Sequence, residues 1–278
     1  MSTVGSSALV KSNQATGTAD DRGALGLPEA VAILGVRMQP WTMRRTIEEI
    51  DRRLQRSEFT HHVVINVAKL VHLRDDPELR AAVEDCDIVN VDGMGVVWGA
   101  RFLGIPIPER VPGVDLFFAL LELSVARGYP VYLLGARPDV IEEVVERLTH
   151  EYPGLEIAGY HHGYFWGDEE HVVSRIRSSG ARLLFVGISS PQKEQFIHRW
   201  KGGLGVTFAM GVGGTFDIVA GVTRRAPRWM QRAGMEWLFR VLQEPRRLWK
   251  RYLFTNLRFL QLIAQEKLRV TRWSEAAR

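Results

Sequence analysis

Polar or glycine-rich segments in this sequence directly follow short apolar runs, and they carry residues suited to chemistry on an anionic substrate. Asp92 follows the run Ile88–Val91 and precedes Gly93, a position where partial burial would raise the pKa of its carboxyl group. Such a carboxylate can act as a general base that takes a proton from a hydroxyl. An isolated Asp-Gly pair is also a common turn, so Asp92 alone leaves both interpretations open.

Glycines follow two other apolar runs and could leave backbone N–H groups free to bind phosphate. These glycines are Gly135, Gly211, Gly213 and Gly214. The last three precede Thr215, where a helix could begin, and helix N-termini bind anions. The spacing is not GxGxxG, because Phe216 stands at the third glycine position, and no Gly-Lys-Ser/Thr of a P-loop follows. Phosphate binding and a plain tight turn both remain open.

Further polar side chains could bind the same ligand. Asn66 follows the run Val63–Ile65, and Gln192 belongs to the polar segment after Leu183–Val186. Arg110 lies in a proline-bounded loop, which suits a guanidinium held in place for a phosphate or carboxylate. C-terminal arginines are spaced to share one side of a helix, and they could neutralise a diphosphate. They are Arg240, Arg246, Arg247 and Arg251.

The elements that position these residues alternate between β-branched runs and helical stretches, which predicts an α/β fold: a Rossmann-like, mostly parallel sheet with helices on both faces. Strands are predicted at Ala32–Leu34, Val63–Val67, Ile88–Val91, Val131–Leu134, Glu156–Gly159, Leu183–Val186 and Val206–Ala209. Helices are predicted from Thr42 to Gln55, from Pro77 to before Asp87, and at Met94–Leu103, Val114–Ala126, Asp139–Glu151, Glu169–Arg177 and Gln192–Trp200. The polar segments then share the edge beyond the carboxyl ends of the strands, where open parallel sheets bind ligands.

Length and composition favour one large domain with an extension. The 278 residues are 46% hydrophobic, enough to bury a sizeable core. We expect residues 1–24 to be a disordered leader without a secretory signal, residues 25–223 to form the α/β body, and residues 224–278 a helical appendage broken near Pro245. Cys86 is the only cysteine, which excludes an intramolecular disulfide and favours an intracellular protein.

No apolar segment of the sequence reaches the roughly 18 residues that a membrane-spanning helix needs.

The charge is distributed unevenly. Residues 224–278 hold 14 Lys and Arg against 4 Asp and Glu, a net charge of +10, whereas residues 1–223 hold 22 against 28, a net charge of −6. The basic region also carries four of the eight tryptophans. This mixture suits an anionic partner such as a phosphate ligand, a lipid surface or nucleic acid, although a solvated basic helix would look similar.

Candidate metal ligands are poorly placed. Asp85-Cys86-Asp87 has the DxD spelling of metal-dependent sugar transferases, but it precedes a predicted strand and so lies away from the crevice. The pairs His61-His62 and His161-His162 fall on or near strands, where adjacent side chains point to opposite faces. We therefore expect neither a metal site nor a bound cofactor.

Taken together, these segments resemble the WecG/TagA/CpsF glycosyltransferases. The matching segments, in order within about residues 30–260, are Asn66, Asp92–Gly95, Glu109–Gly113, Gly159–Phe165, Ser190–Glu194, Gly211–Asp217, Arg225–Met230, Glu236–Arg240 and Gln243–Arg247. The resemblance implies a metal-independent, inverting enzyme that moves a sugar from a UDP-sugar to a polyprenyl-diphosphate-linked sugar. It places the reaction on the cytoplasmic face of the plasma membrane, in bacterial surface polysaccharide synthesis, with N-acetylmannosamine or a related hexose transferred.

The resemblance also implies roles for individual residues. Asp92 matches the general base, and Asn66 and Arg110 match substrate-binding residues. Arg240 and Arg247 match arginines of an appendage that is thought to close over the site, contact the nucleotide diphosphate and dock on the membrane. The residues expected near the nucleotide diphosphate are Gly135, Gly211, Gly213, Gly214, Arg240, Arg246 and Arg247.

Two departures from the family pattern affect these expectations. Val64 stands where the family often has threonine, and the segment Pro191–Glu194 reads Pro-Gln-Lys-Glu instead of Pro-Lys-Gln-Glu, so Gln192 would act from a shifted position. From the residues alone, a dinucleotide-binding oxidoreductase and a non-enzymatic, nucleic-acid-binding module remain alternatives. The missing GxGxxG argues against the first, and the lack of an RNP or helix-turn-helix pattern argues against the second. The apolar helical tail also suits self-association.

Overall fold

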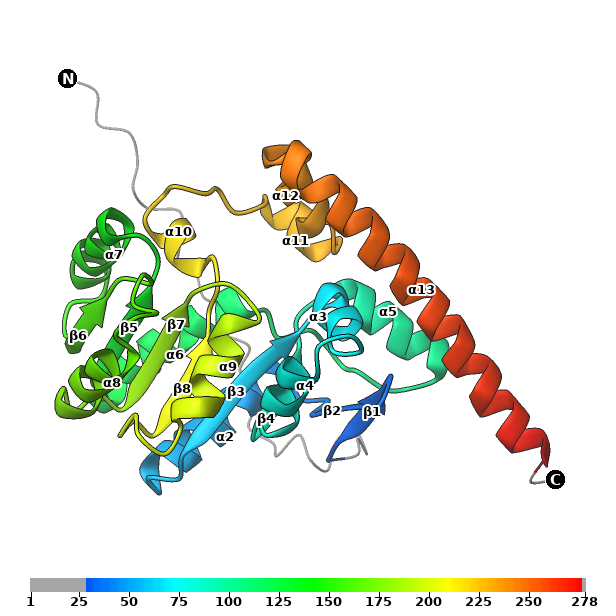
Figure 1. Ribbon diagram of the computed structural model, residues 1–278, viewed down its shortest axis with the longest axis horizontal. Coiled ribbons are helices and arrows are strands. Elements are labelled where there is room, and N and C mark those ends of the chain that lie inside the picture. Colours follow the sequence, from blue (N-terminus) through cyan, green and yellow to red (C-terminus); the bar gives the residue numbers. More distant parts are fainter. Residues whose placement is uncertain (1–28, 277–278) are drawn as a thin grey trace.

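A six-stranded parallel sheet forms the centre of the molecule (Figure 1). The computed structural model describes residues 29–276, without the side chains of Arg247, Arg251 and residues 270–276; the expected leader, residues 1–24, lies outside the described residues. The strands run in the order β4-β3-β8-β7-β5-β6. They are β3 (Thr60–Ile65), β4 (Ile88–Val91), β5 (Val131–Gly135), β6 (Ile157–His161), β7 (Leu183–Gly187) and β8 (Phe208–Gly211). The predicted α/β fold is confirmed.

Helices cover both faces because alternate strand residues point to opposite sides of the sheet. In β5, Val131 and Leu133 pack in a core with α2, α6 and α7, whereas Tyr132 and Leu134 pack in another with α8 and α9. These helices are α2 (Met43–Gln55), α6 (Gly113–Arg127), α7 (Pro138–Glu151), α8 (Glu169–Ser178) and α9 (Gln192–Trp200). Both faces are therefore buried, as the near-continuous apolar runs require.

The β3–β4 end of the sheet is packed differently. A third core joins residues of β3 and β4 to α3 (Val67–His72), α4 (Pro77–Glu84) and α5 (Met94–Leu103). The sequence prediction carried strand β3 to Val67, but the chain enters α3 there, because the Asn66 side chain caps that helix by accepting a hydrogen bond from Lys69 N at 3.0 Å. The Asn66 side chain is thus held at the junction of a strand and a helix.

One predicted strand does not join the parallel sheet. The segment predicted as Ala32–Leu34 forms β1 (Val31–Ile33), which pairs antiparallel with β2 (Val36–Met38) in a separate two-stranded sheet. Leu34 and Gly35 both have positive φ, 52° and 78°, as in the two-residue turns that favour hairpins. A strand is therefore present as predicted, but its expected place in the parallel sheet was wrong, because the tight turn pairs it with the strand that follows it.

The C-terminal region is helical, as predicted. Between residues 224 and 276 it contains α11 (Arg228–Arg232), α12 (Glu236–Gln243) and α13 (Pro245–Ala276), and the short helix α10 (Thr215–Val219) precedes this region. Pro245 begins α13, which explains the break between the last two helices, because proline fits the first turn of a helix but not its interior. Within residues 29–276, no helix pairs the length with the apolar character needed to cross a bilayer.

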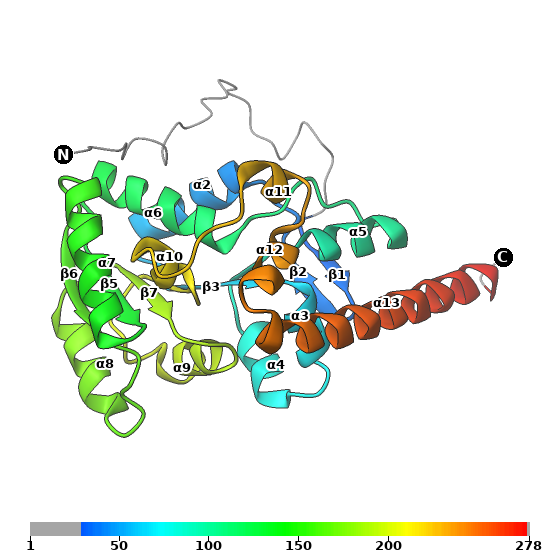
Figure 2. The same ribbon diagram turned by 90° about the horizontal axis from the view of Figure 1, so that it is seen from above.

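Helix α13 lies across α3 and α5 and then extends beyond the body (Figures 1 and 2). It packs closely on α5 at Gly99, where an added Cβ would lie 2.8 Å from Phe259 Cζ and 3.2 Å from Ile263 Cδ1. The glycine therefore allows the two helices to approach until the aromatic ring touches the α5 backbone. This contact holds the middle of α13 against the body.

Candidate active site

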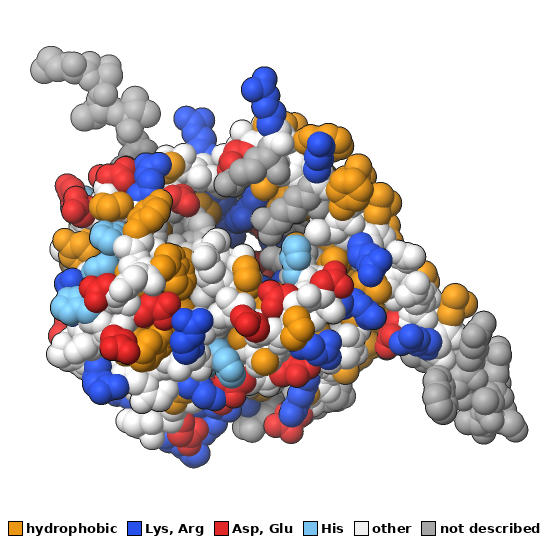
Figure 3. Space-filling model, in the orientation of Figure 1, with side chains coloured by type: hydrophobic (Ala, Val, Ile, Leu, Met, Phe, Trp, Pro, Cys, Tyr) orange, Lys and Arg blue, Asp and Glu red, His pale blue; other side chains and the backbone are white. Residues whose placement is uncertain are grey.

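A pocket of about 850 Å³ lies beyond the carboxyl ends of β3 and β4, between the sheet and the C-terminal helices. Figure 3 shows the molecule hollowed in this region. Five residues singled out from the sequence line it: Asn66, Asp92, Arg110, Gly214 and Arg240. A pocket is therefore present at the carboxyl edge of the parallel sheet, where ligands bind in open α/β folds.

Asp92 is fixed at the sheet edge by the backbone. Its N–H donates to Ile65 O at 2.9 Å, which continues the pairing of β4 with β3 one residue beyond the strand. Burial raises the pKa of the Asp92 carboxyl group, and the nearby Glu236 carboxylate raises it further. The positive charges of Arg240 and Arg110 lower the pKa of Asp92 and so partly offset this increase. The carboxyl group is therefore a better proton acceptor than an ordinary aspartate.

Asn66 directly follows β3 and Asp92 directly follows the neighbouring strand β4, so the two residues lie close together, and the exposed Asn66 lines the pocket. Its Oδ1 atom is occupied by the cap to Lys69 N. The side-chain amide group is then the part that can donate hydrogen bonds to a ligand.

Arginines from the body and from the appendage meet at the pocket around Glu236. Arg110 donates hydrogen bonds to Glu236 Oε2 and to Gln231 O, the latter at 3.0 Å. Arg225 binds Asp115 in a bidentate pair at 2.5 and 2.8 Å, and its Nε atom lies 3.5 Å from Glu236 Oε1. The arginines that line the pocket are Arg110, Arg224, Arg225 and Arg240. Such a set can hold a phosphate or diphosphate, because each guanidinium offers several donors in a plane.

The other predicted residues lie outside the pocket lining. Gly211 makes room for a lysine, since an added Cβ would lie 2.5 Å from Lys193 Cδ, and Gly135 allows close strand packing, 2.5 Å from the Gly187 backbone. Gln192 is exposed, and its Oε1 atom accepts a hydrogen bond from Ser189 Oγ at 3.0 Å. The remaining members of this group are Gly213, with a positive φ of 54°, and the exposed Arg246. The Arg247 side chain lies outside the described residues.

A buried charge cluster below Asn66 was not anticipated. Lys69 Nζ lies 2.7 Å from Glu194 Oε1 and donates to Val64 O at 2.9 Å, and Lys193 Nζ lies 3.2 Å from the same Glu194 oxygen. Burial opposes ionisation of Glu194, but the two ammonium groups outweigh it and lower its pKa to about 2. The only sequence signal was the charged pair Lys193-Glu194 inside a helix with a buried face, because the partner Lys69 is 125 residues away.

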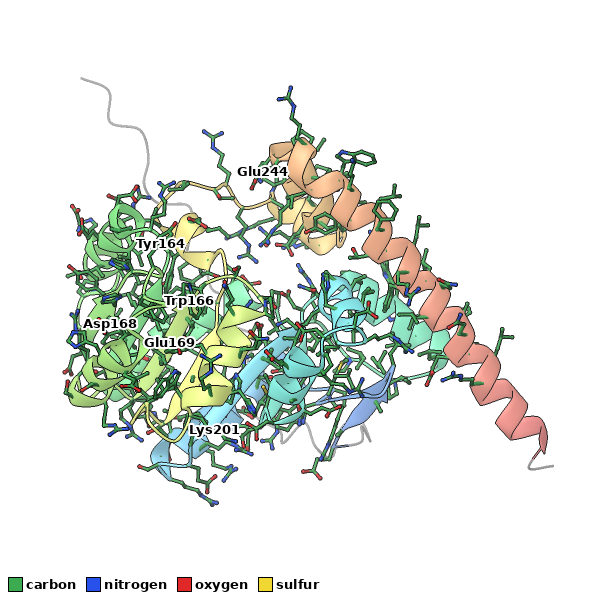
Figure 4. All side chains as sticks on the ribbon, viewed as in Figure 1. Tyr164, Trp166, Asp168, Glu169, Lys201 and Glu244 are labelled. Carbon is green, nitrogen blue, oxygen red and sulfur yellow. The ribbon has the colours of Figure 1, made fainter. Side chains whose placement is uncertain are left out.

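The histidines and aspartates considered as metal ligands have other partners. Burial lowers the pKa of His61 to about 3 and that of His62 to about 4, so both imidazoles are neutral near pH 7. Asp85 pairs with Lys201 at 2.6 Å and with His198 at 2.8 Å. Figure 4 shows Lys201 at the end of the molecule opposite Glu244, which lines the pocket. Among the described residues no cluster of three or more His, Cys, Asp or Glu is placed to hold a metal ion.

A parallel sheet covered on both faces carries, at its carboxyl edge, a pocket lined by Asp92 and by four arginines, an arrangement that suits an α/β enzyme acting on an anionic substrate. Residues 31–272 match the family model for the glycosyl transferase WecG/TagA/CpsF family. The chain therefore belongs to this family of glycosyltransferases. This result replaces the oxidoreductase and the non-enzymatic binding module as interpretations of the fold.

Two relatives from Bacillus carry the same name, N-acetylglucosaminyldiphosphoundecaprenol N-acetyl-beta-D-mannosaminyltransferase. The protein from Bacillus spizizenii strain W23 is 36% identical over 178 residues, which cover 64% of this chain and 68% of the relative. The protein from Bacillus subtilis strain 168 is 34% identical over 206 residues, which cover 70% of this chain and 80% of the relative. The similarity to each relative thus covers about two thirds of this chain.

Proposed function

We propose that this enzyme transfers a sugar, N-acetylmannosamine or a related hexose, from a UDP-sugar to the sugar of a polyprenyl-diphosphate-linked acceptor. The product would be an intermediate in the synthesis of a bacterial surface polysaccharide. The names of the two Bacillus relatives support the acceptor class and the transferred sugar. The observation that carries the proposal is the position of Asp92, a carboxylate with a raised pKa in a pocket lined by arginines.

In this mechanism Asp92 accepts the proton of the acceptor hydroxyl as the oxygen attacks the anomeric carbon of the donor. The new glycosidic bond forms while the bond from the anomeric carbon to the UDP oxygen breaks, which inverts the configuration in one displacement. The electron pair of the broken bond leaves with UDP. One carboxylate is sufficient for this reaction, whereas a retaining double displacement needs a nucleophile as well.

We assign stabilisation of the departing UDP to arginines of the appendage. Arg224, Arg225 and Arg240 line the pocket beside Asp92, and donors aimed at the developing charge are among the largest contributions to catalysis. The backbone around Gly214, at the start of α10, lies on the same side of the pocket and would contact the diphosphate. We place the Asn66 amide and Arg110 next to the sugars, because both lie close to Asp92.

The acceptor lipid requires contact with a membrane, and we assign this contact to α13 at the cytoplasmic face. Steps of three, four or eight residues place exposed apolar side chains on one face of this helix. We call this face the α13 stripe; it consists of Trp249, Leu253, Leu257, Leu260 and Leu268. Lys250, Arg258 and Lys267 lie on the same helix. An apolar stripe with nearby cations suits an anionic bilayer surface.

The proposal is tested by measuring UDP release from a panel of UDP-sugars with a polyprenyl-diphosphate-linked N-acetylglucosamine as the acceptor. Release that depends on the acceptor, and that Asp92→Asn lowers by about 10²–10⁴-fold, would support it. Asp139→Asn is the matched control, because Asp139 is exposed at the start of α7 and pairs only locally with Arg137. Turnover by Asp92→Asn equal to that of the control would remove Asp92 as the base.

A further inference from the structure

The pocket continues beyond Asp92 and the arginines into an apolar groove between α5 and α13. One side of α5 contributes Met94, Gly95, Trp98, Gly99 and Phe102. These positions are separated by one, three or four residues and therefore share one face of the helix. The facing residues of α13 are Tyr252, Asn256, Phe259, Leu260, Ile263 and Ala264. We call this part of the pocket the α5–α13 groove.

Buried side chains form the floor of the α5–α13 groove, and solvent-exposed aromatic side chains form its walls. Phe259 and Ile263 are each 4% exposed and pack against Gly99, so solvent cannot pass between the two helices at that point. Trp98 and Phe102 are 51% and 57% exposed, although both point into the lined space. Large aromatic side chains that are exposed to solvent next to each other form an apolar patch. Such patches commonly mark binding surfaces.

The direction of the groove relates it to the catalytic carboxylate. It begins at Met94, two residues after Asp92, and reaches Phe102 in the last turn of α5. At 1.5 Å per residue this run is about 12 Å long. Cationic side chains therefore lie at the end of the pocket near Asp92, and hydrocarbon lines the other end.

The groove is also continuous with the surface assigned to the membrane. Leu260 lines the pocket and belongs to the α13 stripe, where it is 63% exposed. A lipid hydrocarbon chain that leaves a bilayer beside the α13 stripe could enter the groove without crossing polar protein surface. At the far end, the Lys267 ammonium lies 5.8 Å from the centre of the Phe102 ring, where a cation suits the boundary with lipid headgroups.

From this arrangement we infer that the α5–α13 groove binds the isoprenoid units next to the diphosphate of the acceptor. The inference rests on the proposed function and adds a subsite for the lipid chain. An amphiphile with a polar head and an apolar chain matches the pocket: its sugar reaches Asp92, and its hydrocarbon lies against Trp98, Phe102 and Leu260. The enzyme then recognises the lipid itself and does not rely on the membrane alone to concentrate it.

Direct binding tests the subsite without relying on turnover. The probes are two diphosphate-linked N-acetylglucosamines, one with a single isoprene unit and one with a farnesyl chain, titrated by calorimetry below their micelle-forming concentrations. The unmodified protein should bind the farnesyl compound about 10- to 100-fold more tightly, because the longer chain buries more apolar surface. Equal dissociation constants for the two probes would overturn the subsite.

Variants place the effect in the groove. In the double variant Phe102→Ser/Leu260→Ser, the dissociation constants of the two probes should differ by no more than about threefold. Only the binding of the farnesyl compound should be weakened. The matched control is Tyr164→Ser/Leu242→Ser, since these side chains are 66% and 67% exposed and lie outside the pocket lining. The control should keep the full preference. A preference that survives in the groove variant, or is lost equally in the control, would contradict the inference.

Two further outcomes distinguish the lipid subsite from the proposed reaction and from a dimer interface. Chain-dependent binding without UDP release from any donor would support the subsite and contradict the proposed reaction. If both probes bind alike and Phe102→Ser/Leu260→Ser converts a dimer to a monomer in sedimentation velocity, the groove holds a second copy of the chain. That result would overturn the lipid subsite.

Discussion

The Arg110 guanidinium donates a hydrogen bond to the Glu236 carboxylate and so joins a loop of the body to helix α12 across 126 residues of sequence. Glu236 also lies 3.5 Å from Arg225 Nε, and its charge raises the pKa of the Asp92 carboxyl group. One side chain of the appendage therefore holds two arginines at the pocket and tunes the proposed base. The appendage contributes to the electrostatics of the site as well as covering it.

This relationship predicts a pH effect for Glu236→Gln. The proposed base works only as the carboxylate, so kcat/KM should fall as the pH drops through the pKa of Asp92. Burial and Glu236 both raise that pKa; removal of the like charge should lower it, and the acidic limb of the profile should move to lower pH. The control is Glu142→Gln, an exposed substitution on α7. An acidic limb that stays in place or moves upward would refute the coupling.

Arg240 and Arg246 should differ in their effect on the donor. Arg240 and Arg246 are both exposed, but only Arg240 lines the pocket and lowers the pKa of the Asp92 carboxyl group. If Arg240 stabilises the leaving diphosphate, Arg240→Ala should lower kcat/KM for the UDP-sugar by about 10²–10³-fold. Arg246→Ala should stay within about threefold of the unmodified enzyme under the same low-salt conditions. The measurement is steady-state kinetics at varied UDP-sugar concentration. Equal losses of kcat/KM in both variants would indicate that the arginines only attract the anionic donor through their charge.

The strand pattern was enough to predict the parallel sheet and to bring Asn66 and Asp92 to one edge. That prediction depends on local periodicity and on a general property of parallel sheets, and both can be read from one sequence. The glycines were harder to interpret. Gly211 and Gly135 follow strands as phosphate-binding glycines do, yet they make room for a lysine side chain and for a neighbouring strand.

The pairing of charged residues that lie far apart in the chain could not be predicted from the sequence. Glu236 belonged to a recognised segment, but nothing in the sequence showed that it would pair with Arg110 or act on Asp92. The same holds for Lys69 and Glu194, whose contact depends on how α3 and α9 pack against β3 and β8. Charge pairs of this kind are set by tertiary packing, so local patterns carry little information about them.

The buried cluster around Glu194 should matter for stability. Glu194→Gln would leave Lys69 and Lys193 buried without their shared carboxylate, and removal of one partner of a buried ion pair costs about 3–5 kcal/mol. We expect urea denaturation at pH 7 to show a loss of that order in the free energy of unfolding. Glu84→Gln is the control, because its pair with Arg80 is exposed and should contribute less than about 1 kcal/mol.

The same cluster predicts how stability depends on pH. The pKa of Glu194 is lowered in the folded protein to about 2, so its contribution is fully present above the unfolded value of about 4.3. It is then lost as the pH falls from there toward the folded value. The difference in unfolding free energy between the unmodified protein and Glu194→Gln should therefore shrink below pH 4. A difference that is constant from pH 7 to pH 3 would show that the carboxylate charge is not the stabilising feature.

The α13 stripe should control binding to membranes without controlling the chemistry. Leu253 and Leu257 are 46% and 57% exposed and lie outside the pocket lining. Leu253→Ser/Leu257→Ser should weaken co-sedimentation with vesicles rich in phosphatidylglycerol by at least about tenfold, because each leucine contributes roughly 1.5–3 kcal/mol when buried. UDP release with a water-soluble acceptor should be unchanged. The control Tyr164→Ser/Val222→Ser removes apolar surface of similar exposure from the body. If this control reduces vesicle binding as much as the α13 variant does, the loss does not depend on where the apolar surface is removed, and the assignment of the bilayer contact to the α13 stripe is contradicted.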